Sequence, residues 1–369
     1  MSRDAATVAD ILAAAARIDR FVTGLTQEAF VDDEKTRSAV LHELLVIGEA
    51  SKRLSAAFRD ANPRVPWRQM AGMRDKLIHA YDAVDVDEVW RTATVDVPTL
   101  AATLRPRSPA SPFPLGAIAG DVIGSVHERA GTKTTDFPLF TPESRFTDDS
   151  VLTAAVADVL ASDRGYAEAI QEWARAYPHA GYGRAFRRWM WSDDVLPYGS
   201  FGNGSAMRAS PVGWACNSLE EVLAEARRSA EVTHDHPEGI KGAQALAAAV
   251  FLARTGASKE EIRTTVTRLS GYDLSRRVDD IRPGYSFDLT CQGSVPEALV
   301  AFLDSRDWED SVRKAISLGG DADTLACMAG AVAEAFYGEV PPAIAAEVVA
   351  RLDDRILGTL ARFAERFVS

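Results

Sequence analysis

Hydrophobic residues recur at helical spacing along most of the chain. The first stripe runs from Val8 to about Thr23 and consists of Ile11, Leu12, Ala15, Ile18, Phe21 and Val22. The same period predicts a short helix from Thr26 and longer helices over 36–58, 69–81 and 86–104. No convincing strand pattern appears among them. The first hundred residues therefore predict a small bundle of four or five helices.

A proline-rich segment separates this bundle from the rest of the chain. Residues 105–114 contain four prolines in ten positions, which is typical of a semi-stiff, extended linker. We predict an amino-terminal domain over 1–105, a linker over 106–114 and a second domain over 115–369. Further apolar stripes in the second domain predict helices over 115–126, 151–160, 243–255, 296–304, 308–318 and 325–337.

Length, charge and cysteine content narrow the class of protein. The 369 residues fit two domains, and a net charge of -12 argues against binding nucleic acid or anionic membranes through a large basic face. The first 108 residues carry 15 Lys and Arg against 16 Asp and Glu, so most of the acidity belongs to the second domain. Three widely spaced cysteines, the lack of a secretory signal and the lack of an 18-residue apolar run predict a cytoplasmic protein with no membrane association.

Two short acidic motifs stand directly before apolar helical stretches. One is Thr147-Asp148-Asp149-Ser150, and the other is Asp321-Ala322-Asp323-Thr324, which follows a pair of glycines. A single Thr or Asp at such a position is an ordinary helix cap. Several oxygen ligands in succession exceed what a cap needs, and hard divalent cations prefer such ligands. We therefore expect the two motifs to pack side by side and to bind a pair of magnesium ions.

Glycine-rich and histidine-containing segments supply further candidate chemistry. Gly116, Gly120 and Gly124 recur every four residues, which favours close packing against a neighbouring helix over a phosphate loop. Residues 197–208 place three glycines and two small hydroxyl side chains ahead of a helix, an arrangement that can bind phosphate through backbone N–H groups. Residues 234–238 contain two histidines and two acids without zinc-ligand spacing, since Pro237 interrupts the helical pattern.

Taken together, these motifs resemble the ADP-ribosylglycohydrolase family, which includes the dinitrogenase-reductase-activating glycohydrolases. The resemblance covers about residues 113–369 and rests on segments that occur in the family's order: Gly120–Gly124, Phe146–Ser150, Gly202–Arg208, Thr233–His234 and Ser317–Thr324. It implies an all-helical domain, and hence an all-α chain, with two magnesium ions (manganese as the alternative) in a cleft. The implied reaction hydrolyses the bond between C1″ of the distal ribose of ADP-ribose and a modified protein side chain, nucleic-acid base or metabolite.

The resemblance also assigns roles to individual residues. It implies that the metal ligands are Thr147, Asp148, Asp149, Asp321, Asp323 and Thr324. It implies a diphosphate- and ribose-binding loop at Gly199, Ser200, Phe201, Gly202, Asn203 and Gly204, with His234 at the ADP part. For the proton chemistry of glycosidic cleavage, the candidates are Asp148, Asp149, Asp321 and Glu128.

The amino-terminal domain carries a separate motif, Arg74-x4-His79-x-Tyr81. In isolation, Arg74 and His79 read as a polar patch on a helix end. With the flanking residues 66–73 and 86–90, the motif resembles the HepT-like branch of the HEPN superfamily over about residues 5–105. That resemblance implies a homodimeric helical bundle and a metal-independent ribonuclease in which His79 moves a proton and Arg74 stabilises the phosphorane. It also implies that a partner nucleotidyltransferase attaches AMP to Tyr81 as an antidote.

Three hypotheses follow for the whole chain. The first is a magnesium-dependent ADP-ribosyl hydrolase fused to a HepT-like domain in a toxin–antitoxin or defence setting, with an ADP-ribosylated protein or nucleic acid as substrate and ADP-ribose as product. The second is a ribonuclease toxin that acts on RNA and is regulated by the hydrolase domain. In the third, the amino-terminal domain is only a dimerisation or binding module.

Overall fold

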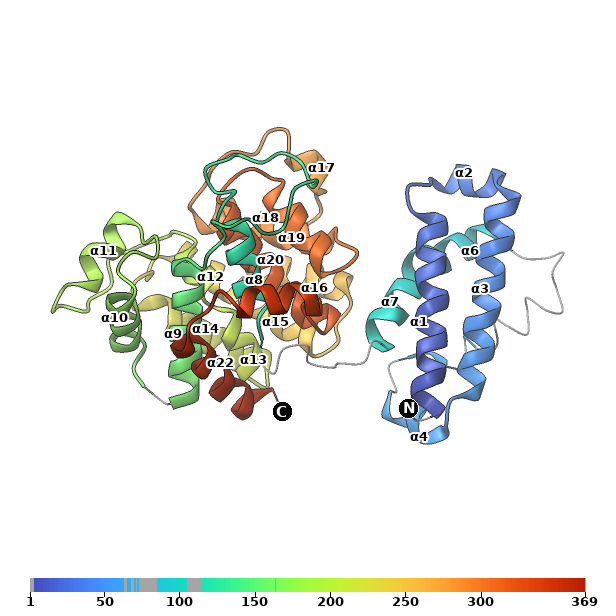
Figure 1. Ribbon diagram of the computed structural model, residues 1–369, viewed down its shortest axis with the longest axis horizontal. Coiled ribbons are helices and arrows are strands. Elements are labelled where there is room, and N and C mark those ends of the chain that lie inside the picture. The colour runs from blue at the N-terminus through green and yellow to red at the C-terminus, as the bar shows by residue number, and fades with distance from the viewer. Residues whose placement is uncertain are drawn as a thin grey trace. The chain divides into compact units, whose positions relative to one another are not determined.

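The computed structural model describes residues 3–62, 65–67, 70, 72, 85–104, 114–162 and 164–368. The chain forms two compact units, Met1–Pro106 and Arg107–Ser369 (Figure 1). Over the described ranges, the only β-type pairing is an isolated antiparallel bridge between Gly202 and Thr290. The predicted all-α fold is confirmed. None of the helices in those ranges is long and apolar enough to cross a membrane.

The amino-terminal unit is built on two long antiparallel helices. Its described elements are α1 (Arg3–Val22), α2 (Gln27–Asp32), α3 (Glu34–Arg53), α4 (Ala56–Ala61), α6 (Val86–Arg91), the π-helical η2 (Thr92–Asp96) and α7 (Val97–Leu104). The apolar stripes of α1 and α3 form the core, which includes the fully buried Ile11, Ile18 and Leu44. Arg17 and Glu43 add a bidentate ion pair between these two helices, with N···O distances of 2.7 and 2.8 Å.

Two predicted helices of this unit are wrong in detail. The helix expected over 36–58 ends at Arg53, because Ser55 starts α4 by accepting a hydrogen bond from the Phe58 N–H. The helix expected over 86–104 contains the π-helical turn Thr92–Asp96. Pro98, two residues after that turn, has no N–H to donate, so the regular bonding pattern is interrupted nearby.

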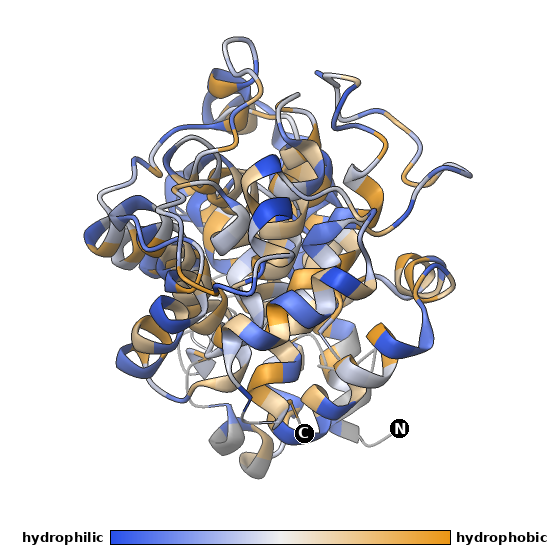
Figure 2. Cartoon of the chain, turned by 90° about the vertical axis from the view of Figure 1, so that its left-hand side faces the viewer, coloured by the Kyte–Doolittle hydropathy of each residue, from blue (hydrophilic) through white to orange (hydrophobic). Residues whose placement is uncertain are grey.

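The carboxyl-terminal unit is a larger assembly of helices. Its elements are α8 (Gly116–Gly124), α9 (Asp148–Ser162), α10 (Tyr166–Ala176), α11 (Arg184–Met190), α12 (Gly204–Met207), α13 (Ser210–Ala215), α14 (Leu219–Glu231), α15 (Pro237–Arg254), α16 (Lys259–Ser270), α17 (Val278–Ile281), α18 (Cys291–Leu303), α19 (Trp308–Ile316), α20 (Ala322–Tyr337), α21 (Pro342–Val349) and α22 (Asp354–Phe367). Figure 2 shows hydrophilic and hydrophobic residues interspersed along the helices on one side of this unit.

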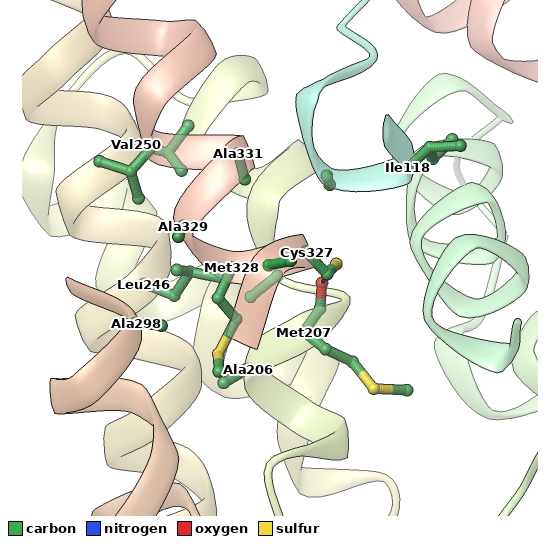
Figure 3. Packing of buried hydrophobic residues seen from close by; sticks show 14 of the residues in the cluster. Ile118, Ala206, Met207, Leu246, Val250, Ala298, Cys327, Met328, Ala329 and Ala331 are labelled. Atoms are coloured by element: carbon green, nitrogen blue, oxygen red, sulfur yellow. Dashed lines mark hydrogen bonds between the residues drawn. The ribbon is translucent and has the colours of Figure 1, made fainter. Parts of the chain in front are cut away.

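Helix α20 lies at the centre of the unit and is buried along almost its whole length. It packs against α8, α15, α18 and α19. Figure 3 shows its side chains Cys327, Met328, Ala329 and Ala331 among residues of α15 and α12. Because most of its residues are small, the surrounding helices approach closely from several sides.

The closest approach is made by the three regularly spaced glycines of α8. A Cβ atom added to Gly120 would lie 2.0 Å from the Ala326 carbonyl oxygen, and one added to Gly124 would lie 2.4 Å from the Cα of Asp323. A Cβ on Gly116 would likewise lie 2.4 Å from the Gly330 carbonyl oxygen. The predicted role of these glycines in close helix packing is confirmed. The contact brings Asp121 of α8 to the first turn of α20.

Two prolines start or enter helices that the sequence pattern placed differently. Pro237 is the first residue of α15, whose cap is His236, and so it begins the helix that we expected it to interrupt. Pro296 lies inside α18, which begins at Cys291 after the cap Thr290. Our prediction placed residues 291–295 in a loop and started this helix at Pro296. The hydroxyl of Thr290, which accepts a hydrogen bond from the Gly293 N–H at 3.1 Å, sets the true start.

Candidate active site

The two predicted acidic motifs form the first turns of α9 and α20, and both turns lie against α8. Burial raises the pKa of Asp149 well above its usual value, and the nearby charge of Asp323 raises it further. Burial raises the pKa of Asp323 in the same way, with Asp321 as the next cause. The structure therefore brings together the acidic residues that the sequence placed in one site.

Asp121 is the residue that anchors the first turn of α9, and sequence reasoning missed it. Its fully buried carboxylate accepts hydrogen bonds from the Thr147 N–H (2.9 Å), the Thr147 hydroxyl (2.6 Å) and the Ser150 N–H (3.1 Å). The Ser150 hydroxyl donates a fourth. Burial raises the pKa of Asp121, while these four hydrogen bonds oppose the rise. The available signal was the acidic residue within Gly120–Gly124, which we interpreted only through its glycines.

The first turn of α20 is held by fewer contacts. Asp321 accepts a 2.7 Å hydrogen bond from the side-chain amide of Asn203, which belongs to the glycine-rich loop. Asp323 accepts a 2.9 Å bond from the N–H of Thr324. Burial also raises the pKa of Asp321, and hydrogen bonding by Asn203 opposes that rise. The predicted ligand-binding residue Asn203 thus contacts the predicted metal-binding residue Asp321.

The carboxylates of the acidic cluster repel one another, and one of their oxygens lacks a hydrogen-bond donor. The Oδ2 atom of Asp149 is buried and has no hydrogen-bond partner. Burial raises the pKa of Asp148 to about 8, with the charge of Asp121 as the second cause. A bound cation would relieve both the repulsion and the missing partner, so the oxygen ligands fit a divalent metal. As arranged here, however, the described residues contain no group of three His, Cys, Asp or Glu side chains close enough to hold one.

Glu128 follows the end of α8 and is half-buried. Its charge contributes to the raised pKa values of Asp148, Asp321 and Asp323, so it faces the same cluster. The neighbouring His127 bonds Thr132 through Nδ1 at 2.9 Å, and burial lowers the pKa of its imidazole. Of the predicted catalytic residues, Glu128 thus lies beside the acidic cluster but does not belong to the first turn of α9 or α20.

The glycine-rich loop has little backbone donor capacity left for a ligand. The N–H of Gly199 donates to Asp235 at 2.8 Å, that of Ser200 to the Thr233 carbonyl at 3.4 Å, and that of Asn203 to the Leu289 carbonyl at 2.7 Å. The Gly202 N–H donates to the Ser200 hydroxyl at 3.2 Å. Anion binding at this loop therefore depends mainly on other donors.

His234 is the best-placed of those donors. A Cβ atom added to Gly204 would lie 3.3 Å from His234 Nε2, and one added to Gly202 would lie 3.7 Å from it. The imidazole is therefore packed against the loop where glycines leave room. Burial lowers the pKa of His234 well below its usual value, and the charge of Arg208 adds to the effect. The ring is neutral at physiological pH.

The tautomer of this ring follows from its neighbours. Arg208, which is fully buried, donates from one terminal nitrogen to the Thr233 hydroxyl at 2.8 Å, and a guanidinium has no acceptor atom. The same hydroxyl lies 2.7 Å from His234 Nδ1. The Thr233 oxygen can accept from Arg208 and still donate its own proton, so we assign that proton to Nδ1 and the ring proton to Nε2. His234 then presents an N–H donor toward the loop.

The HEPN-type residues Arg74, His79 and Tyr81 lie outside the described residues. All three cysteines are free thiols, with Cys291 and Cys327 buried and Cys216 half-buried.

The two parts of the chain match different protein families. The sequence model of the ADP-ribosylglycohydrolase family matches residues 113–369, and that of the ribonuclease HepT-like family matches residues 11–106. ADP-ribosylhydrolase ARH3 of Gallus gallus is 28% identical over 330 residues, covering 66% of this chain and 90% of the relative. "Probable ribonuclease HepT" of Thermococcus cleftensis is 47% identical over 91 residues, covering 25% of this chain and 83% of the relative.

A solved structure is similar to the larger part. It is described as an ADP-ribosylglycohydrolase-related protein complex, with a TM-score of 0.50 and 26% sequence identity. The similarity covers 70% of this chain and 98% of that one.

Proposed function

The chain belongs to the ADP-ribosylglycohydrolase family through residues 113–369, and on that basis we propose that it removes ADP-ribose from a modified protein side chain or nucleic-acid base in a magnesium-dependent reaction. Membership makes it a glycosyl hydrolase. The observation that carries the finer proposal is the cluster of buried aspartates at the starts of α9 and α20, whose pKa values are all raised. Such a cluster is stable in its charged form only with a cation.

We assign the metal to six oxygen-bearing residues, namely Thr147, Asp148, Asp149, Asp321, Asp323 and Thr324. When bound there, two magnesium ions, with manganese as the alternative, would supply Lewis-acid activation of a water and would orient the ribose hydroxyls. The unpartnered Oδ2 of Asp149 supports this assignment, because a buried anionic oxygen without a donor is otherwise costly. We do not include Asp121 among the metal ligands, because its oxygens already accept four hydrogen bonds.

Acidic residues of the chain are proposed to move the proton that hydrolysis requires. Hydrolysis breaks the bond between C1″ and the acceptor, adds the hydroxyl of water to C1″ and returns a proton to the departing group. Asp148, Asp149, Asp321 and Glu128 are the candidates for moving that proton. Glu128 is best suited among them, because it faces the cluster from outside the two helix starts.

The ADP part of the substrate is proposed to lie along residues 199–204. The Nε2–H of His234 is proposed to donate to the diphosphate, since four backbone N–H groups of the loop are already engaged. Phe201, of which 46% is exposed, offers an apolar surface at the same loop.

Release of ADP-ribose tests this proposal. The full chain is incubated with ADP-ribosylated arginine protein, serine peptide, DNA and RNA, each with magnesium and with EDTA. We expect release from at least one substrate with magnesium and none with EDTA. Failure on every substrate would overturn the proposal.

A second activity is proposed for the amino-terminal unit, which matches the HepT-like model and resembles a HepT relative at 47% identity. We propose a metal-independent ribonuclease that uses Arg74 and His79, is modified at Tyr81 and works as a homodimer in a toxin–antitoxin or defence setting. RNA cleavage by Asp321→Asn that disappears in His79→Ala would support it. RNA cleavage unchanged by His79→Ala would favour the alternative in which this unit only dimerises or binds.

A further inference from the structure

Residues 173–192, between Glu172 and Asp193, form a basic and aromatic stretch that the proposed reaction does not use. These twenty residues contain four arginines and six aromatic residues but no Asp or Glu, although the chain as a whole has a net charge of -12. Helix α11 lies in this stretch, and Figure 1 shows α10 and α11 at the left-hand edge of the carboxyl-terminal unit. Basic residues interleaved with aromatic ones are typical of surfaces that bind nucleic acid.

Helix α11 separates these residues into two faces. Phe186, Trp189 and Met190 are buried, and their i, i+3, i+4 spacing places them together on the inner side. Arg184, Arg187 and Arg188 have the same spacing and are all exposed. Trp191 comes one turn later and is 59% exposed. We call the exposed set Arg184, Arg187, Arg188 and Trp191 the α11 face.

The exposed tryptophan is held in place by α10. Arg175 donates to the Met190 carbonyl at 2.5 Å and to the Ser192 carbonyl at 3.2 Å, while Gln171 donates to the Trp189 carbonyl at 2.9 Å. The guanidinium carbon of Arg175 lies 5.8 Å from the centre of the Trp191 ring. The end of α11 is thus fixed by hydrogen bonds, and the ring of Trp191 is kept at the surface.

The arginines of the α11 face differ from others on or beside the helices of this unit. Arg227, Arg263 and Arg351 each form an ion pair with a glutamate three or four residues away. In α11 no acidic residue occurs at such a distance. The three guanidinium groups therefore remain available for phosphate, which they match with paired N–H donors.

The same stretch reaches the candidate active site. The Asp148 N–H donates to the Ala180 carbonyl at 2.9 Å, and a Cβ atom on Gly181 would lie 2.6 Å from Asp148 Oδ1. Arg184 lies three positions after Gly181, a span of at most about 11 Å. A strand lying on the α11 face would therefore end beside the acidic cluster.

We propose that the α11 face binds a single-stranded nucleic acid and directs its ADP-ribosylated nucleotide into the acidic site. The arginines contact successive phosphates and Trp191 stacks on a base. Binding itself stands independently, whereas delivery of the modified nucleotide rests on the hydrolase function proposed above.

The test measures binding of a fluorescent, unmodified twelve-nucleotide single-stranded DNA to the full chain between 50 and 300 mM salt. The test variant is R184Q/R187Q/R188Q, and the matched control is R227Q/R228Q/R263Q, which removes the same charge from other exposed helices. We expect the test variant to bind about tenfold more weakly at low salt and to lose about 2 units of the log–log salt slope, because three phosphate contacts are lost. Equal binding by the two variants would overturn the proposal.

Two further measurements locate the strand and identify its class. An oligonucleotide carrying 5-iodouracil should crosslink to the peptide that contains Trp191, and crosslinking only to residues 1–106 would place nucleic-acid binding in the amino-terminal unit instead. Polyglutamate of equal charge should compete poorly. Competition as strong as that of DNA would indicate an acidic protein as the partner and would overturn the proposal.

Hydrolysis assays distinguish a failure of the α11-face proposal from a failure of the proposed hydrolase function. With an ADP-ribosylated oligonucleotide, R184Q/R187Q/R188Q should lower kcat/KM through KM, and release from ADP-ribosyl-arginine should not change. Binding without hydrolysis of any substrate would contradict the hydrolase function and leave the α11 face as a nucleic-acid surface. Hydrolysis of the oligonucleotide with an unchanged KM in the variant would contradict the role of the α11 face alone.

Discussion

The two acidic helix starts, residues 147–150 and 321–324, carry similar side chains but are held by different neighbours. The start of α9 is fixed by one buried carboxylate, Asp121, which accepts four hydrogen bonds from it. The start of α20 is fixed by the amide of Asn203 and by close contact with Gly124. The first arrangement depends on a buried charge and the second on a neutral donor and on shape. We expect the two starts to respond differently to substitution.

The largest effect is expected from Asp121→Asn, which tests the charged anchor. The amide keeps one accepting oxygen and replaces the other by an NH2 group. That group faces either the Thr147 hydroxyl, which then loses its acceptor, or the N–H groups of Thr147 and Ser150, which are donors themselves. We expect a loss of about 2–4 kcal/mol in the free energy of unfolding and at least about a hundredfold loss in kcat. Urea denaturation and ADP-ribose release measure the two losses. Asp273→Asn, at an exposed site that accepts two hydrogen bonds from Ser275, is the control and should cost much less stability than Asp121→Asn and leave kcat unchanged.

A smaller effect is expected on the free energy of unfolding when the pH is varied in the absence of metal. Burial and neighbouring charges raise the pKa of Asp148 to about 8 in the folded chain, from 3.8 when unfolded. The folded state therefore binds the proton more tightly, and stability in EDTA is greatest at low pH and falls as the pH rises toward 8. Asp148→Asn should remove on the order of 2 kcal/mol of this dependence, because the neighbouring carboxylates share the repulsion.

Denaturation midpoints in EDTA between pH 5 and 8.5 measure the pH dependence of stability for the unaltered chain and for Asp148→Asn. Parallel curves of midpoint against pH for the two proteins would contradict the contribution expected from Asp148. Saturating magnesium should flatten the curve of the unaltered chain, since the metal replaces the proton as the neutralising charge.

The next effect concerns the neutral anchor of α20. Asn203→Ala removes one hydrogen bond to Asp321 and should cost about 1–2 kcal/mol, less than Asp121→Asn. Because Asn203 also belongs to the proposed ligand loop, KM should rise more than kcat falls. Thermal unfolding and steady-state kinetics provide both numbers. A stability loss equal to that of Asp121→Asn would show that the two helix starts are anchored equally.

The smallest effect is expected at the hydroxyl that orients His234. Thr233→Val keeps the shape of the side chain but removes the donor to Nδ1, so the ring can adopt either tautomer. We expect ADP-ribose affinity to fall about three- to tenfold, and Thr233→Ser should restore it. Nitrogen NMR of the imidazole should show a protonated Nε2 in the unaltered chain and a mixture in Thr233→Val. An unchanged tautomer in Thr233→Val would contradict this role.

Local sequence signals predicted much of the fold. Helical periodicity and the glycines of α8 gave the fold class and the closest helix contact, because both depend on residues near one another in the chain. Pro237 and Pro296 were placed wrongly. We expected Pro237 to interrupt a helix, but it begins α15, and we expected Pro296 to begin a helix, but it lies inside α18, because each start follows the capping side chain. His236 and Thr290 supply those caps.

The candidate site was predicted in part. Residues 147–149 and 321–324 could be recognised, because each motif is compact and precedes an apolar helix. Asp121 could not be assigned its role, since its four donors lie 26 to 29 residues away and only the packed helices bring them together. The engaged amides of Gly199, Ser200 and Asn203 were equally hidden, because their acceptors lie on distant loops. The role of the predicted metal ligands remains a prediction.

The contact between α8 and α20 leaves almost no free space between the two backbones beside the acidic cluster. With no side chain between the two backbones at Gly120 and Gly124, a rotamer change has nothing to shift there, and the helices can separate only by losing the contact altogether. The helix contact therefore sets where the backbones of Asp121 and Asp323 lie. Only side-chain movement is left to bring three of the carboxylates close enough to hold a metal ion.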